Sequence, residues 1–334
     1  MAMYNSSSIK IGYRTAAVTI AGTLRGKAVW LIFLTLVLST PSLFADKTSG
    51  DYDYIVKEDD TIEITDYNGS DSDITIPETL YDYPDGDKTV TSIGYKTFAN
   101  CDSLQSVSIP NSVTSIGEYA FENCDNLQSI TIPDSVTSIG DYAFRDCTSL
   151  QSITIPKDVY SIGDTVFLGC SSLISISIAD GNTSYSSVDG VLLNDDQTTL
   201  IKYPIGNARE SYTIPDSVTS IGGWAFANCD SLKSIMIPDS VTSIGVRAFQ
   251  DCDSLQSVTI QDSVTSIENN AFGNCNSLKY ACFTGDAPAN SGFVFPDSHD
   301  DFTLYYHAGA EGFSTPRWEV YPSVEIPPAS YFLA

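Results

Sequence analysis

The chain has 334 residues, with 16 Lys and Arg against 42 Asp and Glu, so its formal net charge is −26. This acidic balance argues against nucleic acid or an anionic membrane surface as a ligand, because phosphate groups are bound by clustered Lys and Arg side chains. Since 42% of the residues are hydrophobic and only 17% are charged, the chain is also too apolar to be disordered throughout.

Residues 1–45 follow the order of a secretory signal peptide. Basic residues and no acidic residue precede Asp46, and residues 28–38 are an apolar run followed by small residues up to Ala45. This order is typical of a cleaved signal, whereas a membrane-spanning helix needs about 20 apolar residues. We predict export with cleavage after Ala45 or Ser42, no membrane insertion of the mature chain, and a secreted or cell-surface location. A retained membrane anchor is the alternative.

Residues 46–73 are predicted to be capping strands at the start of a repeat stack. The segments 51–55 and 61–65 alternate apolar and polar residues, which is typical of half-buried strands. An end unit of this kind covers a core that would otherwise be open.

Residues 74–283 contain a repeated unit of 23 residues, and this repeat determines the predicted fold. The segment Ser-Val-Thr-Ser-Ile-Gly at 112–117 recurs at 135–140, 217–222 and 240–245, with degenerate copies at 89–94, 158–163 and 263–268. A unit of this length cannot bury its own apolar face, but stacked units bury one continuous core. The repeated residues that we expect to form this core ladder are Phe98, Phe121, Phe144, Phe167, Phe226, Phe249 and Phe272, with Cys101, Cys124, Cys147, Cys170, Cys229, Cys252 and Cys275.

Each unit contains two extended segments and one turn. Residues 127–132 alternate inward Leu and Ile with outward Ser and Thr, and Pro133 ends this strand because it has no amide proton to donate. Residues 113–116 form a second extended segment that ends at Gly117, and residues 118–122 are expected to make one helical turn. The sequence therefore predicts an α/β repeat, in which short strands with short helical turns stack into a right-handed solenoid.

These motifs resemble the BspA-like (Treponema pallidum-type) leucine-rich repeats. The shared features are the Leu-x-x-Ile-x-Ile strand and the segment Val-x-x-Ile-Gly-x-x-Ala-Phe-x-x-Cys, which recur seven times over residues 74–283. The resemblance implies a leucine-rich-repeat solenoid in an exported or cell-surface binding protein, often an adhesin, without a shared catalytic residue. Because that family is functionally diverse, the resemblance identifies no ligand.

Two segments depart from the repeat. Cys170 and Cys229 are 59 residues apart, so one coil carries an insertion, which we place at residues 180–213. Its strand-like parts, 188–193 and 199–203, flank Asn194–Gln197, which predicts a hairpin projecting from one enlarged coil. Residues 284–334 are predicted to be an atypical C-terminal cap.

The outward strand positions give the candidate binding surface. Nearly all of them carry small hydroxyl side chains, which would form two parallel files on one sheet face; we call this surface the hydroxyl face. Its residues are Ser106, Ser108, Ser129, Thr131, Ser152, Thr154, Ser175, Ser177, Ser211, Thr213, Ser234, Met236, Ser257 and Thr259.

A surface of hydroxyls with acidic edges suits contact with an extracellular glycan or an extended protein through many weak hydrogen bonds. We predict these two regions, the hydroxyl face and the hairpin at 184–203, as the contact regions. A structural or matrix protein without a specific ligand is the alternative. Ice binding is a remote alternative, because regular Ser-x-Thr files on a flat sheet can order water.

The seven repeat cysteines allow more than one interpretation. Neighbouring coils lie about 4.8 Å apart, which is near the lower limit for a disulfide. Each of these cysteines nevertheless lies three residues after a core Phe, in a position that is expected to be buried. Seven cysteines also cannot all pair with one another, so free buried thiols are favoured over partial bridging. Zinc is disfavoured because the sequence has no C-x-x-C spacing. Cys282 falls on an outward strand position and is the expected exposed thiol.

Little in the sequence points to catalysis, and we predict neither an enzyme nor a cofactor. His299 and His307 lie in the expected cap, and the abundant serines belong to the repeat, so a serine–histidine centre would be accidental. The acidic groups at 82–87, 195–196 and 297–301 do not match the twelve-residue calcium loop. A hydrolase remains a remote alternative.

Overall fold

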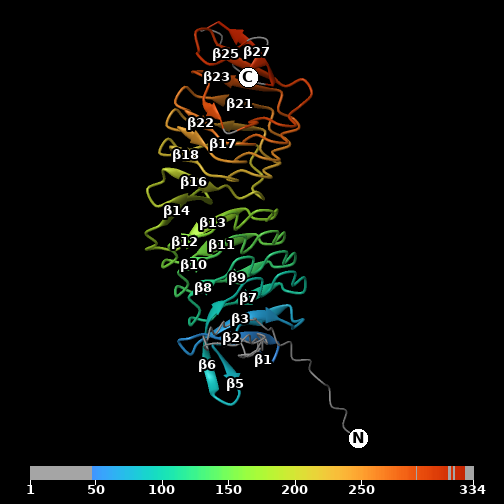
Figure 1. Ribbon diagram of the computed structural model, residues 1–334, viewed down its shortest axis with the longest axis vertical. Coiled ribbons are helices and arrows are strands. Elements are labelled where there is room, and N and C mark those ends of the chain that lie inside the picture. Colours follow the sequence, from blue (N-terminus) through green and yellow to red (C-terminus); the bar gives the residue numbers. More distant parts are fainter. Residues whose placement is uncertain (1–46, 291, 315–316, 319, 328–334) are drawn as a thin grey trace, which may run out of the picture.

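The computed structural model describes residues 47–290, 292–314, 317–318 and 320–327, so the predicted signal peptide and its cleavage site lie outside the described residues. These residues form an elongated stack of about ten coils, each of about 23 residues (Figure 1). The predicted solenoid of 23-residue coils is therefore confirmed, whereas its handedness stays a prediction. Among the described residues there is no helix that could span a membrane.

Two faces of parallel strands run along the stack. One face, which carries the outward hydroxyls, is built from β4 (Asp73–Thr75), β7 (Ser106–Ser108), β9 (Ser129–Thr131), β11 (Ser152–Ile155), β13 (Ser175–Ile178), β17 (Ser211–Thr213), β19 (Ser234–Met236), β21 (Ser257–Ile260), β23 (Tyr280–Phe283), β25 (Thr303–His307) and β27 (Tyr321–Ile326). The second face is built from β6 (Gly86–Ile93), β8 (Ser115–Ile116), β10 (Ser138–Ile139), β12 (Ser161–Ile162), β16 (Thr199–Lys202), β18 (Ser220–Ile221), β20 (Ser243–Ile244), β22 (Ser266–Ile267) and β24 (Ala289–Asn290).

The remaining strands lie at the ends of the stack or in the insertion. They are β1 (Lys47–Ser49), β2 (Tyr52–Val56), β3 (Ile62–Tyr67), β5 (Thr79–Asp82), β14 (Tyr185–Val188), β15 (Val191–Asn194) and β26 (Arg317–Trp318).

The predicted helical turn in each coil is wrong, because the described residues contain no helix. In the turn after Gly117, Tyr119 and Asn123 both have a φ of 56°, a left-handed conformation that interrupts a right-handed helix. The backbone amides of this turn also bond to the next coil: Phe121 N donates to Ala143 O over 2.8 Å and Asn123 N to Arg145 O over 2.9 Å. The turns therefore gain more from stacking on one another than from bonds within one helix.

Aromatic rings form the centre of the stack, and all seven repeat phenylalanines are buried. Phe98 and Phe121 lie 4.9 Å apart and 2° from parallel, and Phe249 and Phe272 lie 4.8 Å apart, also 2° from parallel. A tyrosine begins each of two such columns of rings. Tyr67 is tilted by 40° against Phe98, whereas Tyr203 lies 25° from parallel to Phe226. The first stack is Tyr67, Phe98, Phe121, Phe144 and Phe167, and the second is Tyr203, Phe226, Phe249, Phe272 and Phe295.

The solenoid consists of two halves with separate cores. One hydrophobic cluster runs from Tyr54 to Ile176 and includes Leu192, and a second runs from Val191 to Tyr321. Within the described residues, no strand of the first half is paired with a strand of the second. Individual bonds join the halves instead: Ile176 N donates to Gly190 O over 2.9 Å, and Tyr185 Oη accepts from Ile162 N over 2.9 Å.

The insertion repeats the architecture of the N-terminal cap. At the N-terminus, β1, β2 and β3 form an antiparallel meander, and β3 then pairs in parallel with β6. In the insertion, β14, β15 and β16 form the same meander, and β16 pairs in parallel with β18. Each meander has two adjacent aspartates at its last turn. The tyrosine that begins an aromatic stack is the last residue of β3 (Tyr67) in the first meander and the residue after β16 (Tyr203) in the second.

The hairpin expected to project from an enlarged coil is therefore part of the wall of the solenoid. Its strand β15 carries Val191, Leu192 and Leu193, all of which are almost fully buried. The strand–turn–strand pattern was read from the sequence, but the three consecutive apolar residues are typical of a strand covered on both sides, not of a projecting one.

The C-terminal segment continues the stack beyond residue 283. Strand β25 pairs in parallel with β23, and β27 with β25, and Phe295 stacks on Phe272 at 5.2 Å. Phe295 follows Phe272 by the repeat distance of 23 residues. An additional coil is thus present where the sequence indicated only a cap.

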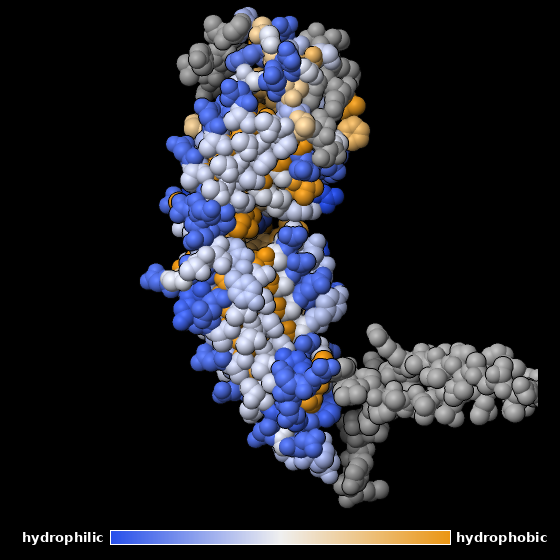
Figure 2. All heavy atoms as spheres, turned by 60° about the vertical axis from the view of Figure 1, so that its left-hand side comes forward, coloured by the Kyte–Doolittle hydropathy of each residue, from blue (hydrophilic) through white to orange (hydrophobic). Residues whose placement is uncertain are grey.

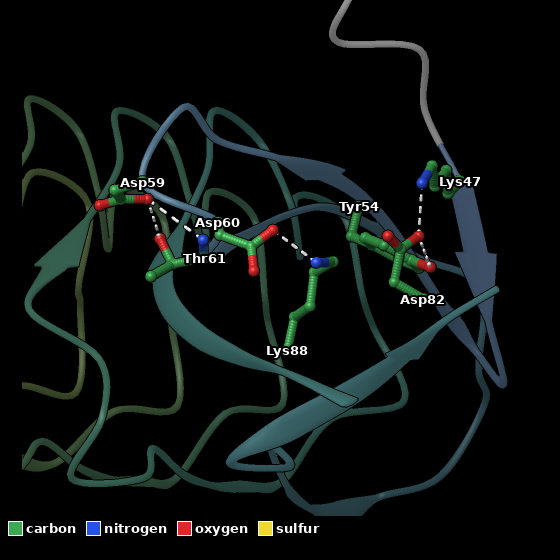
Figure 3. A network of polar contacts seen from close by, with 7 residues as sticks. All are labelled: Lys47, Tyr54, Asp59, Asp60, Thr61, Asp82 and Lys88. Atoms are coloured by element: carbon green, nitrogen blue, oxygen red, sulfur yellow. Dashed lines mark hydrogen bonds and ion pairs between the residues drawn. The ribbon is translucent and has the colours of Figure 1, made fainter. Parts of the chain in front are cut away.

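Polar contacts attach the β5–β6 hairpin to the N-terminal cap (Figure 3). The buried carboxylate of Asp82 accepts from Lys47 Nζ over 2.5 Å and from Tyr54 Oη over 3.1 Å. Lys88 Nζ lies 2.5 Å from a carboxylate oxygen of Asp60. These pairs connect β5 and β6 to strands β1 to β3 around the open end of the core.

Candidate binding surfaces

The hydroxyl face is made of register-matched pairs of residues. In β7 and β9, Ser106 is paired with Ser129 and Ser108 with Thr131. In β11 and β13, and again in β17 and β19, the corresponding positions are paired in the same way. Most of these side chains are exposed, while Ser106, Ser108, Ser175 and Ser257 are partly covered.

The insertion divides the hydroxyl face into two runs. The turn between β14 and β15 lies against β13, and a Cβ added to Gly190 would lie 3.0 Å from the Cβ of Ser175. Strands β9 and β11 belong to different sheets but remain in contact, whereas β13 and β17 are neither paired nor in comparable contact. The pair Ser175 and Ser177 therefore ends one run, and the pair Ser211 and Thr213 begins the next. Met236 is 62% exposed in the second run and lines a groove of about 440 Å³ with Thr213 and Gln261.

The repeat cysteines are free thiols, and all but the first are buried; Cys101 is partly covered. Five of them donate a hydrogen bond to the carbonyl of the phenylalanine 26 residues earlier, in the preceding coil. These bonds are 3.0–3.1 Å long and join Cys124 to Phe98, Cys147 to Phe121, Cys170 to Phe144, Cys252 to Phe226 and Cys275 to Phe249. The thiol is small enough for the core and supplies a donor to a buried carbonyl.

Burial keeps these thiols protonated. Desolvation raises the pKa of Cys124, Cys170 and Cys229 from 9.0 to about 12. Because the thiolate is the reactive form, the ladder is a structural feature of the core. Cys282 is partly covered, and burial raises its pKa as well.

The sequence-derived acidic and histidine candidates do not converge on a metal or catalytic site. Among the described residues, no group of three or more His, Cys, Asp or Glu side chains is placed to hold a metal ion. Asp82 is buried against Lys47 and Tyr54. His299 Nδ1 accepts a hydrogen bond of 3.1 Å from the backbone amide of Asp301.

The structure contains a groove that sequence reasoning missed. Figure 2 shows the surface hollowed about half-way along the molecule, with apolar residues inside the hollow. Where the two halves meet, a groove of about 450 Å³ is lined by residues of both halves, among them Thr148, Ser171, Ile205, Asn228, Asp230 and Ser231. The signal in the sequence was the 59-residue gap between Cys170 and Cys229, because one coil of the stack has no cysteine turn.

Comparisons with known proteins agree with this architecture. The family model for the BspA type leucine-rich repeat region matches residues 83–188 and 206–297 in six copies. The chain is similar to the crystal structure of a leucine-rich repeat protein from Eubacterium ventriosum, with 24% identity, a TM-score of 0.60, and coverage of 84% of this chain and 83% of that one.

Two further solved structures show weaker similarity. The pneumococcal vaccine antigen PcpA is 20% identical over 80% of this chain and 94% of its own, with a TM-score of 0.49. The T. pallidum leucine-rich repeat protein is 23% identical over 63% of this chain and 90% of its own, with a TM-score of 0.40. The search of curated proteins finds no match. Because the family model covers more than half of the residues, the chain belongs to the family of BspA type leucine-rich repeat proteins.

Proposed function

We propose that the protein is a non-catalytic binding module that is exported and acts outside the cell or on its surface. The observation that carries the proposal is the hydroxyl face, on which exposed Ser and Thr residues repeat in register from coil to coil. A rigid surface of this kind offers many hydrogen-bonding groups at a fixed spacing of about 4.8 Å. It suits an adhesin-like contact with an extended glycan or protein.

Two other features support this proposal. The order of residues 1–45 indicates export, and the repeat family provides a scaffold that presents surfaces. The net charge of −26 favours neutral or basic partners, because like charges repel anionic ones.

The test replaces exposed hydroxyls with a longer, charged side chain. Ser129→Lys with Thr131→Lys changes the first run, and Ser234→Lys with Thr259→Lys changes the second. Asn111→Lys with Ser217→Lys is the matched control, since both residues are exposed in turns outside the strands. Binding to glycan arrays and extracellular-matrix proteins is measured for each variant.

The proposal expects at least a tenfold loss of binding in one or both face variants, with the control within twofold of the unmodified protein. Undiminished binding by both face variants would contradict the hydroxyl face as the contact surface. If the unmodified protein binds no glycan or matrix protein, the structural alternative, in which the stack itself is the product, is favoured instead.

A further inference from the structure

The groove between the two halves is about one coil wide, and its origin can be traced to the insertion. In regular coils, the turns around each cysteine stack on one another along the edge of the solenoid. In the insertion the corresponding turn is Pro204-Ile205-Gly206, which is drawn inward: Gly206 N donates to Leu173 O over 2.8 Å. A Cβ on Gly206 would lie 2.5 Å from the backbone carbon of Ser172, so only glycine permits this approach. One step is thereby missing from the stack of turns.

The missing step leaves the side-chain amide of Asn228 without the partner that its equivalents have. Residues immediately before the cysteines form a ladder, in which Asn123 Nδ2 donates to Asn100 Oδ1 over 2.9 Å and Asn274 Nδ2 to Asp251 Oδ1 over 2.8 Å. The residue 23 positions before Asn228 is Ile205, which has no polar side chain. In the part of the chain that the structure describes, no side-chain hydrogen bond of Asn228 is formed, and this residue lines the groove.

Other polar groups line the groove beside Asn228. Asp230 contributes a carboxylate, and partial burial together with the nearby Asp253 raises its pKa. Hydroxyls of Thr148 and Ser171 face it from the first half, and that of Ser231 from the second. Ile205 is only 8% exposed and adds an apolar patch. The groove thus combines amide donors, carboxylate and hydroxyl acceptors and one apolar side chain.

We propose that this groove binds one residue of an uncharged glycan. Neighbouring sugar hydroxyls can donate to the Asp230 carboxylate and accept from the Asn228 amide at the same time, while a C–H face of the ring packs on Ile205. The width of one missing coil, about 4.8 Å, is close to the thickness of a pyranose ring. The inference rests on the proposed binding function and places a saccharide subsite next to the hydroxyl face.

The charges of the surroundings separate this ligand from its competitors. Asp230, Asp251 and Asp253 lie on the same edge and repel sialylated or sulfated glycans. Asp230 is exposed, so these three carboxylates would also attract a basic side chain. A basic peptide is therefore an outcome to be tested against the proposal.

The experiment pairs groove variants with equivalent positions elsewhere on the ladder. Asn228→Asp removes the amide donors, and Asp230→Asn removes the carboxylate charge. Asn123→Asp and Asp102→Asn make the same changes at equivalent positions of the repeat away from the groove. Asn228 and Asn123 have φ values of 63° and 56°, which aspartate also adopts, so neither backbone is strained by the change.

The probes are arrays of uncharged gluco-, galacto-, manno- and N-acetylhexosamine oligosaccharides, with sialylated and sulfated glycans and Lys- and Arg-rich peptides for comparison. The expected result is binding of at least one uncharged oligosaccharide with a dissociation constant below about 1 mM. The two groove variants should weaken it at least tenfold, and the two controls by less than twofold.

Three results would overturn the inference: no uncharged oligosaccharide binds, a basic peptide binds more tightly than any oligosaccharide, or groove variants bind like their controls. If binding survives the groove variants but is lost in the Lys variants of the hydroxyl face, the groove is not a saccharide subsite, whereas the proposed function is supported. If binding is lost in the groove variants but survives in the Lys variants, the groove is supported as the subsite and the hydroxyl face is not part of the contact.

Discussion

Leu192 and Leu193 are consecutive residues of β15, yet their side chains lie in two different hydrophobic cores. Successive side chains of a strand point to opposite faces, so Leu192 packs against the first half and Leu193 against the second. Both are at most 1% exposed. Strand β15 is therefore a wall between two solenoid halves, each of which begins with its own antiparallel meander and has its own aromatic stack.

This relationship predicts two cooperative units in one chain. Leu192→Ala should destabilise the first half and Leu193→Ala the second, each by about 2–5 kcal/mol, the usual range for a leucine removed from a core. Hydrogen exchange followed by mass spectrometry measures the effect for each half separately, because amide protection reports local unfolding free energies.

The two variants are each other's control, since they are adjacent and make the same chemical change. We expect amides in β7, β9 and β11 to lose protection in Leu192→Ala, and amides in β19, β21 and β23 in Leu193→Ala. Equal loss of protection over both halves in both variants would show that the solenoid unfolds as one unit.

The buried thiols predict a loss of stability at high pH. In the folded state burial raises the pKa of Cys124, Cys147, Cys170, Cys229 and Cys252 above the ordinary 9.0, with hydrogen bonding to Cys275 as the largest cause for Cys252. Below pH 9 the thiols are protonated in both states, so they add no pH dependence. Above pH 9 the unfolded chain loses these protons first, and stability falls until the folded thiols titrate, at about pH 12 for Cys124. Each thiol contributes a slope of about 1.4 kcal/mol per pH unit.

Cys147→Ser tests this linkage at a single position. Serine retains a donor for the carbonyl of Phe121, which the thiol of Cys147 contacts at 3.1 Å, but its hydroxyl does not titrate in this range. Denaturant unfolding between pH 9 and 11 should therefore show a slope that is smaller by about 1.4 kcal/mol per pH unit than in the unmodified protein. An unchanged slope would mean that this thiol is not shielded from solvent.

The general fold could be predicted from the sequence because the repeat states it seven times. Each copy carries the same inward Phe and the same strand with alternating faces, so a single mistaken position does not alter the result. The turn conformation was missed because it depends on contacts with the next coil: Tyr119 is left-handed, and its amide donates to Asp141 O over 2.9 Å. The sequence of residues 118–122 alone does not show this hydrogen bond to the next coil.

The candidate site was predicted in part. The outward position of the Ser and Thr pairs follows from strand alternation alone, so the register of the hydroxyl face was accessible. The groove could not be predicted in this way, because it arises where one coil lacks the cysteine turn. The close approach of Gly206 to Ser172 that accompanies it is a tertiary contact. The second meander could in principle have been recognised from the sequence. Two adjacent aspartates precede Tyr203 in the insertion, as they precede Tyr67 in the N-terminal cap.

Asp82 is expected to stabilise the N-terminal end of the first half. Asp82→Asn removes the charge that Lys47 contacts at 2.5 Å and weakens the acceptor for Tyr54 Oη. Because Asp82 is buried, we expect a loss of about 1–3 kcal/mol in the free energy of unfolding of the first half. Asp85→Asn is the control, since Asp85 is exposed on the same hairpin, and should change stability by less than about 0.5 kcal/mol. Equal effects of the two variants would contradict a structural role for the Lys47–Asp82 pair.

Lys202 is expected to cost stability in the second half. It occupies the place of the repeat Ala that precedes the core aromatic residue, it is buried, and its Nζ donates to Trp224 O over 3.0 Å. Burial lowers its pKa below the ordinary 10.5, so the folded state binds this proton less tightly than the unfolded chain does. Stability should therefore rise as the pH increases through the window between the lowered folded pKa and 10.5.

Lys202→Met keeps the length of the side chain and removes the charge. We expect a gain of roughly 1 kcal/mol at pH 7 in the unfolding of the second half, because the desolvation cost of a buried ammonium exceeds the value of one hydrogen bond. Lys233→Met is the matched control, since Lys233 is an exposed lysine of the same half and should leave stability nearly unchanged. A loss of stability in Lys202→Met that exceeds the loss in the control would show that the bond to Trp224 outweighs the cost of burying the charge.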